Sequence, residues 1–432
     1  MAADKKLLSP MKHNPLLIIF SSISLILVVV YTLRSIYPSP DLKPKIKILP
    51  LWQTDPDADS DETPGYIRRC SSSRRDNPSK TFYDDRKLRY MVGKSIENWD
   101  ELRKQWLKTH PSFLHRSDKR VVVVTGSQPA PCKSPSGDHV LLRLFKNKVD
   151  YCRIHGYDIF YNNAMLHPKM TSYWAKIPAI RSAMVAHPEA EWVWWVDSDA
   201  VFTDMDFVPS LERFNNYNLV LGGSNDSVYG KNPSSLGLDT GVIYIRNCQW
   251  SMDFIEDWAK MGPQTRDYNR WGQILTSTFK DKLMPDSDDQ SAMIYLLREN
   301  KKWSEKTMVE KNPKPNKNWS TLVTTLENVT RNYQTLERKF PKLRRRHAEV
   351  VGESNGILWD DHLKNLDNKR PTITHFAGCE PCGGESNSLY GGDEDCRLGI
   401  EKALNFADNQ VLKRFGFMHP NLLDLTSVVT VA

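Results

Sequence analysis

Two carboxylates, Asp197 and Asp199, directly follow the apolar run Trp192–Val196. The run is too short for a free-standing helix and suits a strand buried on both faces, which puts the acids at its carboxyl end. Residues two apart in an extended chain point the same way, so both carboxylates can face one ligand. Because Mg²⁺ and Mn²⁺ prefer oxygen ligands from carboxylates, phosphate and water, the pattern predicts a site for a divalent cation and a diphosphate. The alternative is that one acid caps the next turn or stays solvated.

A second candidate group, Asp288, Asp289 and Gln290, opens an apolar stretch that is predicted to be helical. Ser287 is a natural N-cap, and Gln290 three residues later would complete a capping box with it. The two acids also suit the positive end of a helix. The functional interpretation is that this helix start points into the site, where carboxylates hold sugar hydroxyls. Both interpretations stay open, because capping does not need all three side chains.

A third candidate, His375, ends a short strand and is followed by Cys379, Cys382 and Cys396. These four residues could form a structural zinc site. In an oxidising compartment cysteines more often form disulfides. We therefore expect a cysteine pair here, which leaves His375 free as an Mn²⁺ ligand. The chain has seven cysteines, so at least one of them is unpaired.

Strand and helix patterns alternate around the first pair of carboxylates. Apolar runs at 121–125, 157–161 and 192–196 indicate strands, and the helical stretches between them end near Gly156 and begin near Pro178. This βαβαβ order predicts an α/β fold with a doubly wound, mostly parallel sheet and right-handed crossovers.

The first strand of such a sheet ends at Gly126, on the same edge as the first pair of carboxylates, so its loop could approach a nucleotide. That loop has no Gly-x-Gly-x-x-Gly or P-loop pattern, so neither a dinucleotide-binding fold nor an NTPase is supported. Two further strands are expected at 218–223 and 240–245. The polar turn 238–241 is either a substrate-contacting turn or an ordinary one.

Composition and charge limit the class of protein. The chain has 432 residues, of which 40% are hydrophobic and 26% charged, ordinary values for a globular protein with one large domain or two. The formal net charge is +7, the basic residues are mostly spread out, and no zinc-finger or RNA-binding aromatic signature occurs. Nucleic acid is therefore not expected as a partner.

The first forty residues predict a membrane anchor. Residues 16–33 are almost wholly apolar without a charge, about the minimum length that spans a bilayer, and they follow three lysines. A cleaved signal peptide is the alternative, but no convincing small-x-small site follows the run. We expect a cytosolic tail over 1–15, the uncleaved anchor over 16–33, a Pro- and Ser-rich stem over 34–83 and a folded domain over 84–432.

Asparagine sequons suggest which side of the membrane that domain occupies. Asn318 and Asn328 each begin an Asn-x-Ser/Thr glycosylation sequon, and Asn225 is a third match. Such sites are used only in the secretory pathway. A single-pass type II topology, with a short cytosolic tail and a lumenal domain, would allow their use. The expected location is the Golgi membrane, the default for an anchored lumenal enzyme.

Several long motifs carry a resemblance to one family. In chain order they are 194–205, 246–253, 261–264, 278–282, 287–290 and 375–379. Together they resemble the plant Golgi family of galactomannan galactosyltransferases and xyloglucan xylosyltransferases, glycosyltransferase family 34, from about residue 84 to residue 397. The resemblance implies a GT-A fold and transfer of a sugar from a UDP-sugar to O6 of a β-1,4-linked backbone, with Mn²⁺ and retention of the α configuration.

The resemblance also implies roles for the residues that could bind the donor. Asp197 and Asp199, together with His375, would hold Mn²⁺ and the diphosphate. Ser198 would lie near the ribose.

The resemblance further implies that Asp288 and Asp289 bind donor or acceptor hydroxyls, and that Gln290 lies beside the anomeric carbon opposite the leaving UDP. A double-displacement enzyme needs a carboxylate nucleophile at that place, and an amide is a poor nucleophile. Gln290 therefore favours front-face attack. In that mechanism the oxygen of the leaving diphosphate takes the acceptor O6 proton, and the amide dipole stabilises positive charge at carbon 1.

Two departures from the xyloglucan type bear on the donor sugar. Glu380 stands between two cysteines where that type has lysine, and residues 221–224 replace a Val-His-Gly-Trp stretch. The second change removes bulk, and galactose needs more room than xylose for its extra CH₂OH group. We expect UDP-galactose and a β-1,4-mannan acceptor, with UDP-xylose and β-1,4-glucan as the alternative. Assembly with itself or with other Golgi polysaccharide synthases is a further expectation.

Two other classes of protein remain as alternatives. A strand that ends in Asp-x-Asp also fits haloacid-dehalogenase-type phosphatases, in which the first Asp is the nucleophile. A non-catalytic Golgi scaffold or polysaccharide-binding protein would use Trp250, Trp271 and Trp319 as stacking platforms.

Overall fold

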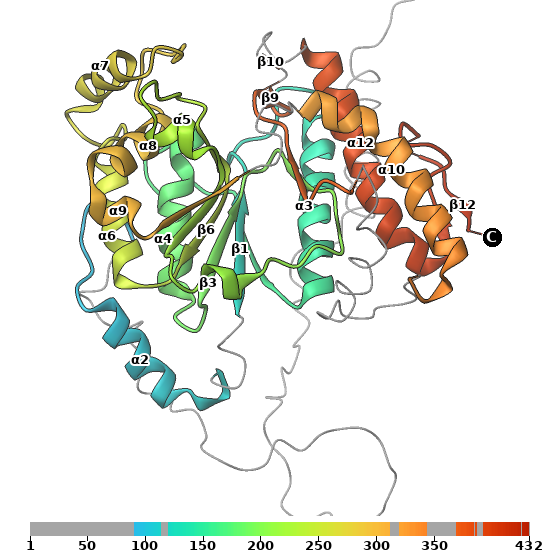
Figure 1. Cartoon of the computed structure of the whole chain (residues 1–432), viewed down its shortest axis with the longest axis horizontal. Coiled ribbons are helices and arrows are strands. Elements are labelled where there is room, and N and C mark those ends of the chain that lie inside the picture. Colours follow the sequence, from blue (N-terminus) through green and yellow to red (C-terminus); the bar gives the residue numbers. More distant parts are fainter. Residues whose placement is uncertain are drawn as a thin grey trace, which may run out of the picture. The chain divides into compact units, whose positions relative to one another are not determined.

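A six-stranded mixed sheet forms the centre of the described chain (Figure 1). This computed structural model describes residues 90–113, 120–311, 319–343, 369–383, 385–386, 392–424 and 426–431. The strands lie in the order β2-β1-β3-β6-β5-β7. Their bounds are β1 (Val121–Gly126), β2 (Asp158–Asn162), β3 (Trp192–Val196), β5 (Leu219–Gly223), β6 (Leu238–Arg246) and β7 (Thr307–Lys311). Strand β6 is antiparallel to both neighbours, whereas the other adjacent pairs are parallel. The predicted α/β class with a mostly parallel sheet is confirmed.

The central strands β1 and β3 are apolar on both faces because a hydrophobic core lies on each side of the sheet. Val124 and Trp195 belong to one core, and Val123 and Trp194 belong to the other. Every residue of β3 is buried. Successive side chains of a strand point to opposite faces, so a continuous apolar run is what a strand covered on both faces requires.

Helices cover both faces of this sheet. Figure 1 shows α4, α6 and α8 on one side and α3, α10 and α12 on the other. Their bounds are α3 (Gly137–His155), α4 (Lys176–Ala186), α6 (Gln249–Ala259), α8 (Asp289–Glu299), α10 (Trp319–Lys339) and α12 (Gly392–Leu412). Helix α3 ends where predicted, because Gly156 at its C-cap has φ 68°, a conformation that glycine adopts readily. The other α-helices in the described part of the chain are α2 (Trp99–Thr109), α5 (Asn225–Tyr229), α7 (Tyr268–Thr278) and α9 (Lys301–Ser304).

A two-stranded ribbon brings a late segment of the chain to the end of β3. Strand β4 (Ala200–Phe202) follows Asp199 directly and pairs antiparallel with β8 (Ile373–His375). Ala200 lies opposite His375 in this pair. The ribbon therefore places His375 next to the carboxylates that end β3. The other short strands are β9 (Cys379–Glu380), β10 (Glu385–Ser386), β11 (Phe417–Met418) and β12 (Val429–Thr430).

Two disulfides, Cys132–Cys382 and Cys379–Cys396, rule out the zinc alternative. The expected cysteine pair is present, since Cys379 and Cys396 bond to each other. Cys382 instead reaches back to Cys132 in the loop after β1. Among the described residues, Cys152 and Cys248 are free.

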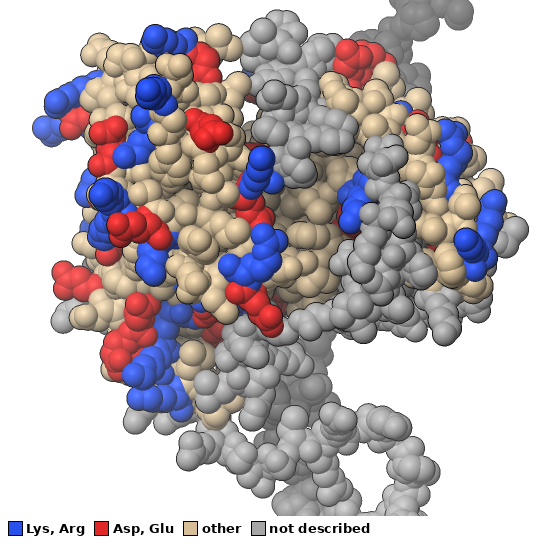
Figure 2. Space-filling view, viewed as in Figure 1, with Lys and Arg blue, Asp and Glu red and all other residues tan. Residues whose placement is uncertain are grey.

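Several sequence predictions concern residues outside the described ranges. They include the tail over 1–15, the anchor over 16–33, the whole stem over 34–83 and Asn318. Among the helices that the structure describes, none is both long and apolar enough to cross a membrane. Asn328 is exposed on α10. On the face shown in Figure 2, Lys and Arg side chains are interspersed with Asp and Glu.

Candidate active site

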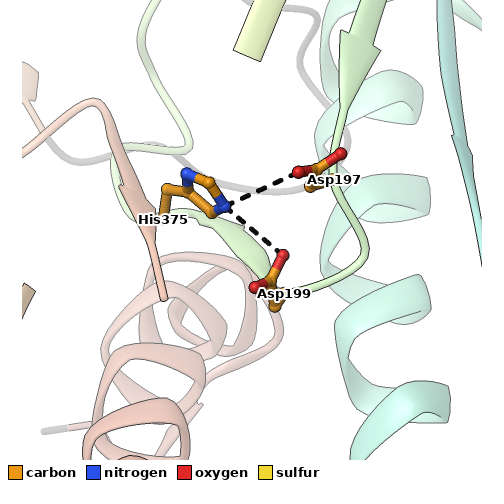
Figure 3. Close-up of side chains that lie close together, drawn as sticks. All are labelled: Asp197, Asp199 and His375. Atoms are coloured by element: carbon orange, nitrogen blue, oxygen red, sulfur yellow. Dashed lines mark ion pairs between the residues drawn. The ribbon is translucent and has the colours of Figure 1, made fainter. Parts of the chain in front are cut away.

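Asp197, Asp199 and His375 come together at the edge of the sheet where β3 ends, and we call them the carboxylate–histidine cluster (Figure 3). His375 Nε2 lies 3.7 Å from Asp197 Oδ2 and 3.5 Å from Asp199 Oδ1. One ligand atom from each residue lies within 4.8 Å of the other two. An octahedral cation with bonds of about 2.1 Å holds neighbouring ligand atoms about 3 Å apart, so small side-chain movements would close this cluster around an ion.

Neighbouring groups hold each member of the cluster in place. The indole Nε1 of Trp195 donates a hydrogen bond to Asp197. His375 Nδ1 lies 2.9 Å from Asp239 Oδ1. Burial by itself lowers the pKa of His375, but the charges of Asp239 and Asp199 outweigh that effect and raise the pKa well above its usual value.

Two buried lysines support the backbone and carboxylates of the cluster. Lys148 Nζ donates to the carbonyl oxygens of Ser198 (3.1 Å) and Ala200 (2.7 Å). Burial lowers the pKa of Lys148 to about 8. Lys176 Nζ lies 3.5 Å from Asp197 Oδ2. Burial opposes the charge on Lys176, but the surrounding carboxylates raise its pKa above the usual value, so it stays positive.

The charge balance of this region suits a divalent cation. Four interacting carboxylates surround His375 and Lys176: Asp197, Asp199, Asp239 and Asp289. Lys148 and Lys176 supply two positive charges against these four negative ones, and His375 with its raised pKa adds a third while it is protonated. A cation that replaced this proton would face two negative charges. Uncompensated buried charge is costly. A bound dication would balance the charge, and the donor set of two carboxylates and one imidazole fits such an ion.

A second group, which we call the lysine–aspartate cluster, adjoins the first through Lys176. It consists of Lys176, Asp289, Thr240 and Gln290. Asp289 Oδ2 lies 2.8 Å from Lys176 Nζ and accepts a hydrogen bond of 3.0 Å from Thr240 Oγ1. Burial raises the pKa of Asp289, and the contact with Lys176 opposes the rise. Gln290 Nε2 donates to the Ser235 carbonyl oxygen at 2.8 Å, which fixes the direction of its amide.

The predicted capping box at the start of α8 is wrong. Helix α8 begins at Asp289, and its N-cap is Asp288, whose Oδ1 accepts the Ser291 N–H at 2.7 Å. Because the cap lies one residue later than expected, Gln290 is not at the N3 position and turns to Thr240 instead. The Ser287 hydroxyl is buried without a hydrogen-bond partner among the described residues. The other oxygen of Asp288 pairs with Lys282.

The residues predicted to contact a nucleotide lie on the same edge. Gly126 ends β1, and the register of β1 with β3 (Val124 opposite Trp195) brings it level with Asp197. A side chain could not be added at Gly126, because a Cβ there would lie 2.2 Å from the Asn162 carbonyl oxygen. The βαβαβ order of the sequence predicted that Gly126 and Asp197 share an edge of the sheet, and the register confirms it.

The sequence of the domain that carries this site matches a known family. Residues 117–386 match the model of the galactosyl transferase GMA12/MNN10 family. The chain belongs to this family. The catalytic interpretation is thereby favoured over the phosphatase and scaffold alternatives, and the chain is a glycosyltransferase. The family implies a nucleotide-sugar donor and a polysaccharide acceptor.

Relatives of this glycosyltransferase span most of its length. It is similar to galactomannan galactosyltransferase 1 of Cyamopsis tetragonoloba, with 51% identity over 87% of this chain and 88% of the relative. It is also similar to glycosyltransferase 6 of Arabidopsis thaliana, with 51% identity over 79% of this chain and 80% of the relative. A probable glycosyltransferase 7 of Oryza sativa subsp. japonica is 48% identical over 79% of this chain and 78% of its own length.

Two polar residues of the site in this glycosyltransferase, Lys148 and Lys176, were not predicted from the sequence. Lys148 gave one signal, because it lies on the buried face of α3 with Leu144 and Tyr151. Asp239 lies within the polar stretch 238–241, which the sequence marked as a possible substrate contact but not as a partner of His375.

The tryptophans proposed as stacking platforms pack into the protein instead. Trp319 is buried and contacts Phe376, with ring centroids 5.2 Å apart. Trp250 is stacked on Phe254. These contacts assign both rings to packing.

Proposed function

We propose that the chain is a GT-A type, retaining galactosyltransferase. It transfers galactose from UDP-galactose in α-1,6 linkage to a β-1,4-mannan backbone. The observation that carries the proposal is the pair of adjoining clusters at the sheet edge: a carboxylate–histidine cluster suited to a dication, and a buried carboxylate, Asp289, with the half-buried amide of Gln290 held beside it. In open α/β sheets, ligands bind at this edge.

We assign the cation to Asp197, Asp199 and His375 and take it to be Mn²⁺. When bound, the ion stabilises the negative charge that develops on the leaving diphosphate. Lys176 keeps Asp197 and Asp289 in place, since its buried ammonium contacts both carboxylates. Trp195 restrains the other oxygen of Asp197.

The lysine–aspartate cluster supports front-face transfer. The Gln290 amide is held by Ser235 and Thr240, and the adjacent Asp289 is buried and bonded to Lys176 and Thr240. Gln290 is an amide and Asp289 is already bonded on its carboxylate, so neither residue offers a free carboxylate nucleophile. In our proposal the bond between carbon 1 and the diphosphate breaks, and the bond from carbon 1 to acceptor O6 forms on the same face. The O6 proton passes to the leaving diphosphate oxygen, and the Gln290 carbonyl dipole stabilises positive charge at carbon 1.

The remaining acid of the predicted group, Asp288, is the better placed to take a sugar hydroxyl. Its side chain keeps 24% of its surface exposed, whereas that of Asp289 keeps 6%. We therefore propose that Asp288 binds a hydroxyl directly, and that Asp289 acts through Lys176 and Thr240.

Two observations favour galactose over xylose. A relative at 51% identity is named as a galactomannan galactosyltransferase. At the end of β5, a Cβ added at Gly222 would meet nothing within 4 Å, so the chain leaves open space at a position where the xyloglucan type has a bulkier residue. The neighbouring Gly223 pairs with Leu238, so this end of β5 adjoins the start of β6.

Incubation of the purified full-length chain with each donor and acceptor tests the proposal. UDP-galactose and UDP-xylose are offered with mannohexaose and with cellohexaose in the presence of Mn²⁺. We expect galactosyl transfer to mannohexaose. Xylosyl transfer to cellohexaose, with no galactosyl transfer to mannohexaose, would overturn the donor and acceptor assignment and leave the glycosyltransferase assignment intact.

We also propose a type II Golgi membrane protein, with residues 16–33 as the anchor and the catalytic domain in the lumen. The exposed position of Asn328 on α10 is compatible with glycan attachment. In sealed Golgi vesicles, the bulk of the chain should resist added protease and carry a glycan that glycosidase removes. Digestion of that bulk from outside would contradict the topology.

A further inference from the structure

Asp239 lies behind the histidine of the carboxylate–histidine cluster. It is the second residue of β6, and because β6 is antiparallel to β3, its start reaches the edge where β3 ends. Its Oδ1 accepts the Gly241 N–H at 2.8 Å and lies 2.9 Å from His375 Nδ1. Asp239 contacts neither Asp197 nor Asp199 directly in any hydrogen bond or ion pair of the described residues. It therefore touches the cluster only through His375.

The contact with Asp239 sets the tautomer of His375 and the direction in which Nε2 points. A neutral imidazole carries one N–H and one lone pair. When Nδ1–H donates to Asp239, the lone pair is on Nε2, the atom that faces the two carboxylates at 3.5 and 3.7 Å. A metal-binding histidine commonly has its other ring nitrogen bonded to a carboxylate in this way.

Gly241 supports the face of the same ring. A Cβ added there would lie 2.2 Å from His375 Cε1 and 2.5 Å from Nδ1. The imidazole is thus pressed against the backbone of β6, although β8 pairs with β4 and not with β6. Two residues at the start of β6 therefore hold the ring, Asp239 at its edge and Gly241 at its face.

We propose that Asp239 is a positioning residue for the cation site: its carboxylate fixes the tautomer and orientation of His375 so that Nε2 can bind the divalent ion. The inference rests on the proposed function, in which His375 is a cation ligand. The polar stretch 238–241 was predicted to be a turn, but it is the start of strand β6, and the proposal gives it a role that differs from substrate contact.

Mn²⁺ affinity of the full-length chain, measured by electron paramagnetic resonance of the free ion, tests the proposal. Asp239→Ala should weaken Mn²⁺ binding about 10- to 100-fold, the usual effect of losing a group that orients a metal ligand. Gly241→Ala should weaken it as well, because the added methyl displaces the ring. Asp239→Asn keeps an oxygen that can accept the Nδ1–H and should lose less than Asp239→Ala.

A matched control is Asp158→Asn. Asp158 has a side-chain exposure of 46%, close to the 43% of Asp239, and it too is paired with a basic residue, Arg120, at 3.0 Å. It is the first residue of β2, which is parallel to β1, so it lies at the sheet edge opposite to the one where the strands end and the cluster lies. We expect its Mn²⁺ affinity to match wild type. Thermal unfolding of each variant checks that the fold survives.

A double-mutant cycle separates positioning from a direct or structural role. If Asp239 acts only through the imidazole, Asp239→Ala should cost no further Mn²⁺ affinity when His375 is already alanine. Additive losses would overturn the proposal. Equal Mn²⁺ affinity in wild type and Asp239→Ala would also overturn it, while leaving the cation site of the proposed function intact. If wild type itself bound no Mn²⁺, the cation assignment and this inference would both fail.

Discussion

Two Asp-x-Asp pairs stand only a few residues apart on either side of β4, and they have different chemical surroundings. Asp197 and Asp199 precede the strand, and Asp204 and Asp206 follow it. Each pair meets a basic residue from the segment that contains β8. His375 faces the first pair, whereas Arg370 contacts the second, with Nη1 3.4 Å from Asp204 Oδ1 and 3.0 Å from Asp206 Oδ2.

The basic partner distinguishes the two pairs. A guanidinium stays charged at any physiological pH and cannot bind a metal ion, so Arg370 is a permanent counter-charge for its acids, and Arg414 is a second one for Asp206. It is further enclosed by the Tyr333 ring, 3.9 Å from its Cζ. An imidazole can be neutral and offer a lone pair, so the first pair keeps room for a cation. The spacing of two acids is common to both sites, and the partner decides whether the site is structural or functional.

The largest effect that this comparison predicts is on stability, at the arginine. Arg370→Met should lower the free energy of unfolding by about 3–5 kcal/mol, because it removes a buried guanidinium that pairs with both acids and leaves Asp206 only its second partner, Arg414. Chemical denaturation of the full-length chain measures it. Arg370→Met that is folded at low temperature should keep wild-type Mn²⁺ affinity. A loss of Mn²⁺ binding in the folded variant would contradict the assignment of the cation to the first pair alone.

A smaller change in free energy, but a large one in rate, is expected at the first pair. Asp199→Ala should reduce transfer roughly a hundredfold or more, since removing one preorganised electrostatic group costs about 3 kcal/mol in the barrier. The midpoint of unfolding should stay near that of wild type. Treatment with EDTA should produce a comparable loss in wild type, and Mn²⁺ should restore it. Full turnover of wild type in the presence of EDTA would contradict the cation assignment.

The smallest effect is on pH dependence and belongs to the second pair. Burial raises the pKa of Asp204 from 3.8 to about 6, with Arg370 opposing the rise. Between these values the folded state holds more protons than the unfolded state, so this contribution to stability is present below about pH 4 and is lost as pH rises to about 6. Asp204→Asn should remove that part of the slope. The measurement is the difference in unfolding free energy between variant and wild type at pH 4 to 7; a pH-independent difference would show that Asp204 does not titrate there.

The sequence predicted the first pair because its signal is local. An apolar run that ends in two acids identifies β3 and its carboxyl end, and the βαβαβ order places Gly126 on the same edge. His375 was found through the family resemblance and a short strand pattern. Its approach to Asp199 depends on the pairing of β4 with β8, which no local pattern specifies.

The remaining parts of the site depend on strand direction and on exact helix ends. The strand that became β6 was predicted, but its antiparallel direction was not, and only that direction carries Asp239 to His375. The predicted cap at Ser287 was one residue off, because two neighbouring residues were both good N-caps and tertiary contacts of Gln290 decided between them. Lys176 gave no signal, because its partners Asp197, Asp289 and Thr240 come from three separate segments of the chain.

Counting the Mn²⁺ bound to each chain tests the central claim most directly, with the two Asp-x-Asp pairs compared side by side. In equilibrium dialysis at one Mn²⁺ concentration, wild type and Asp206→Asn should each bind one ion per chain, and Asp199→Asn should bind far less. Wild-type binding in Asp199→Asn, or a loss confined to Asp206→Asn, would contradict the assignment of the catalytic cation to Asp197, Asp199 and His375.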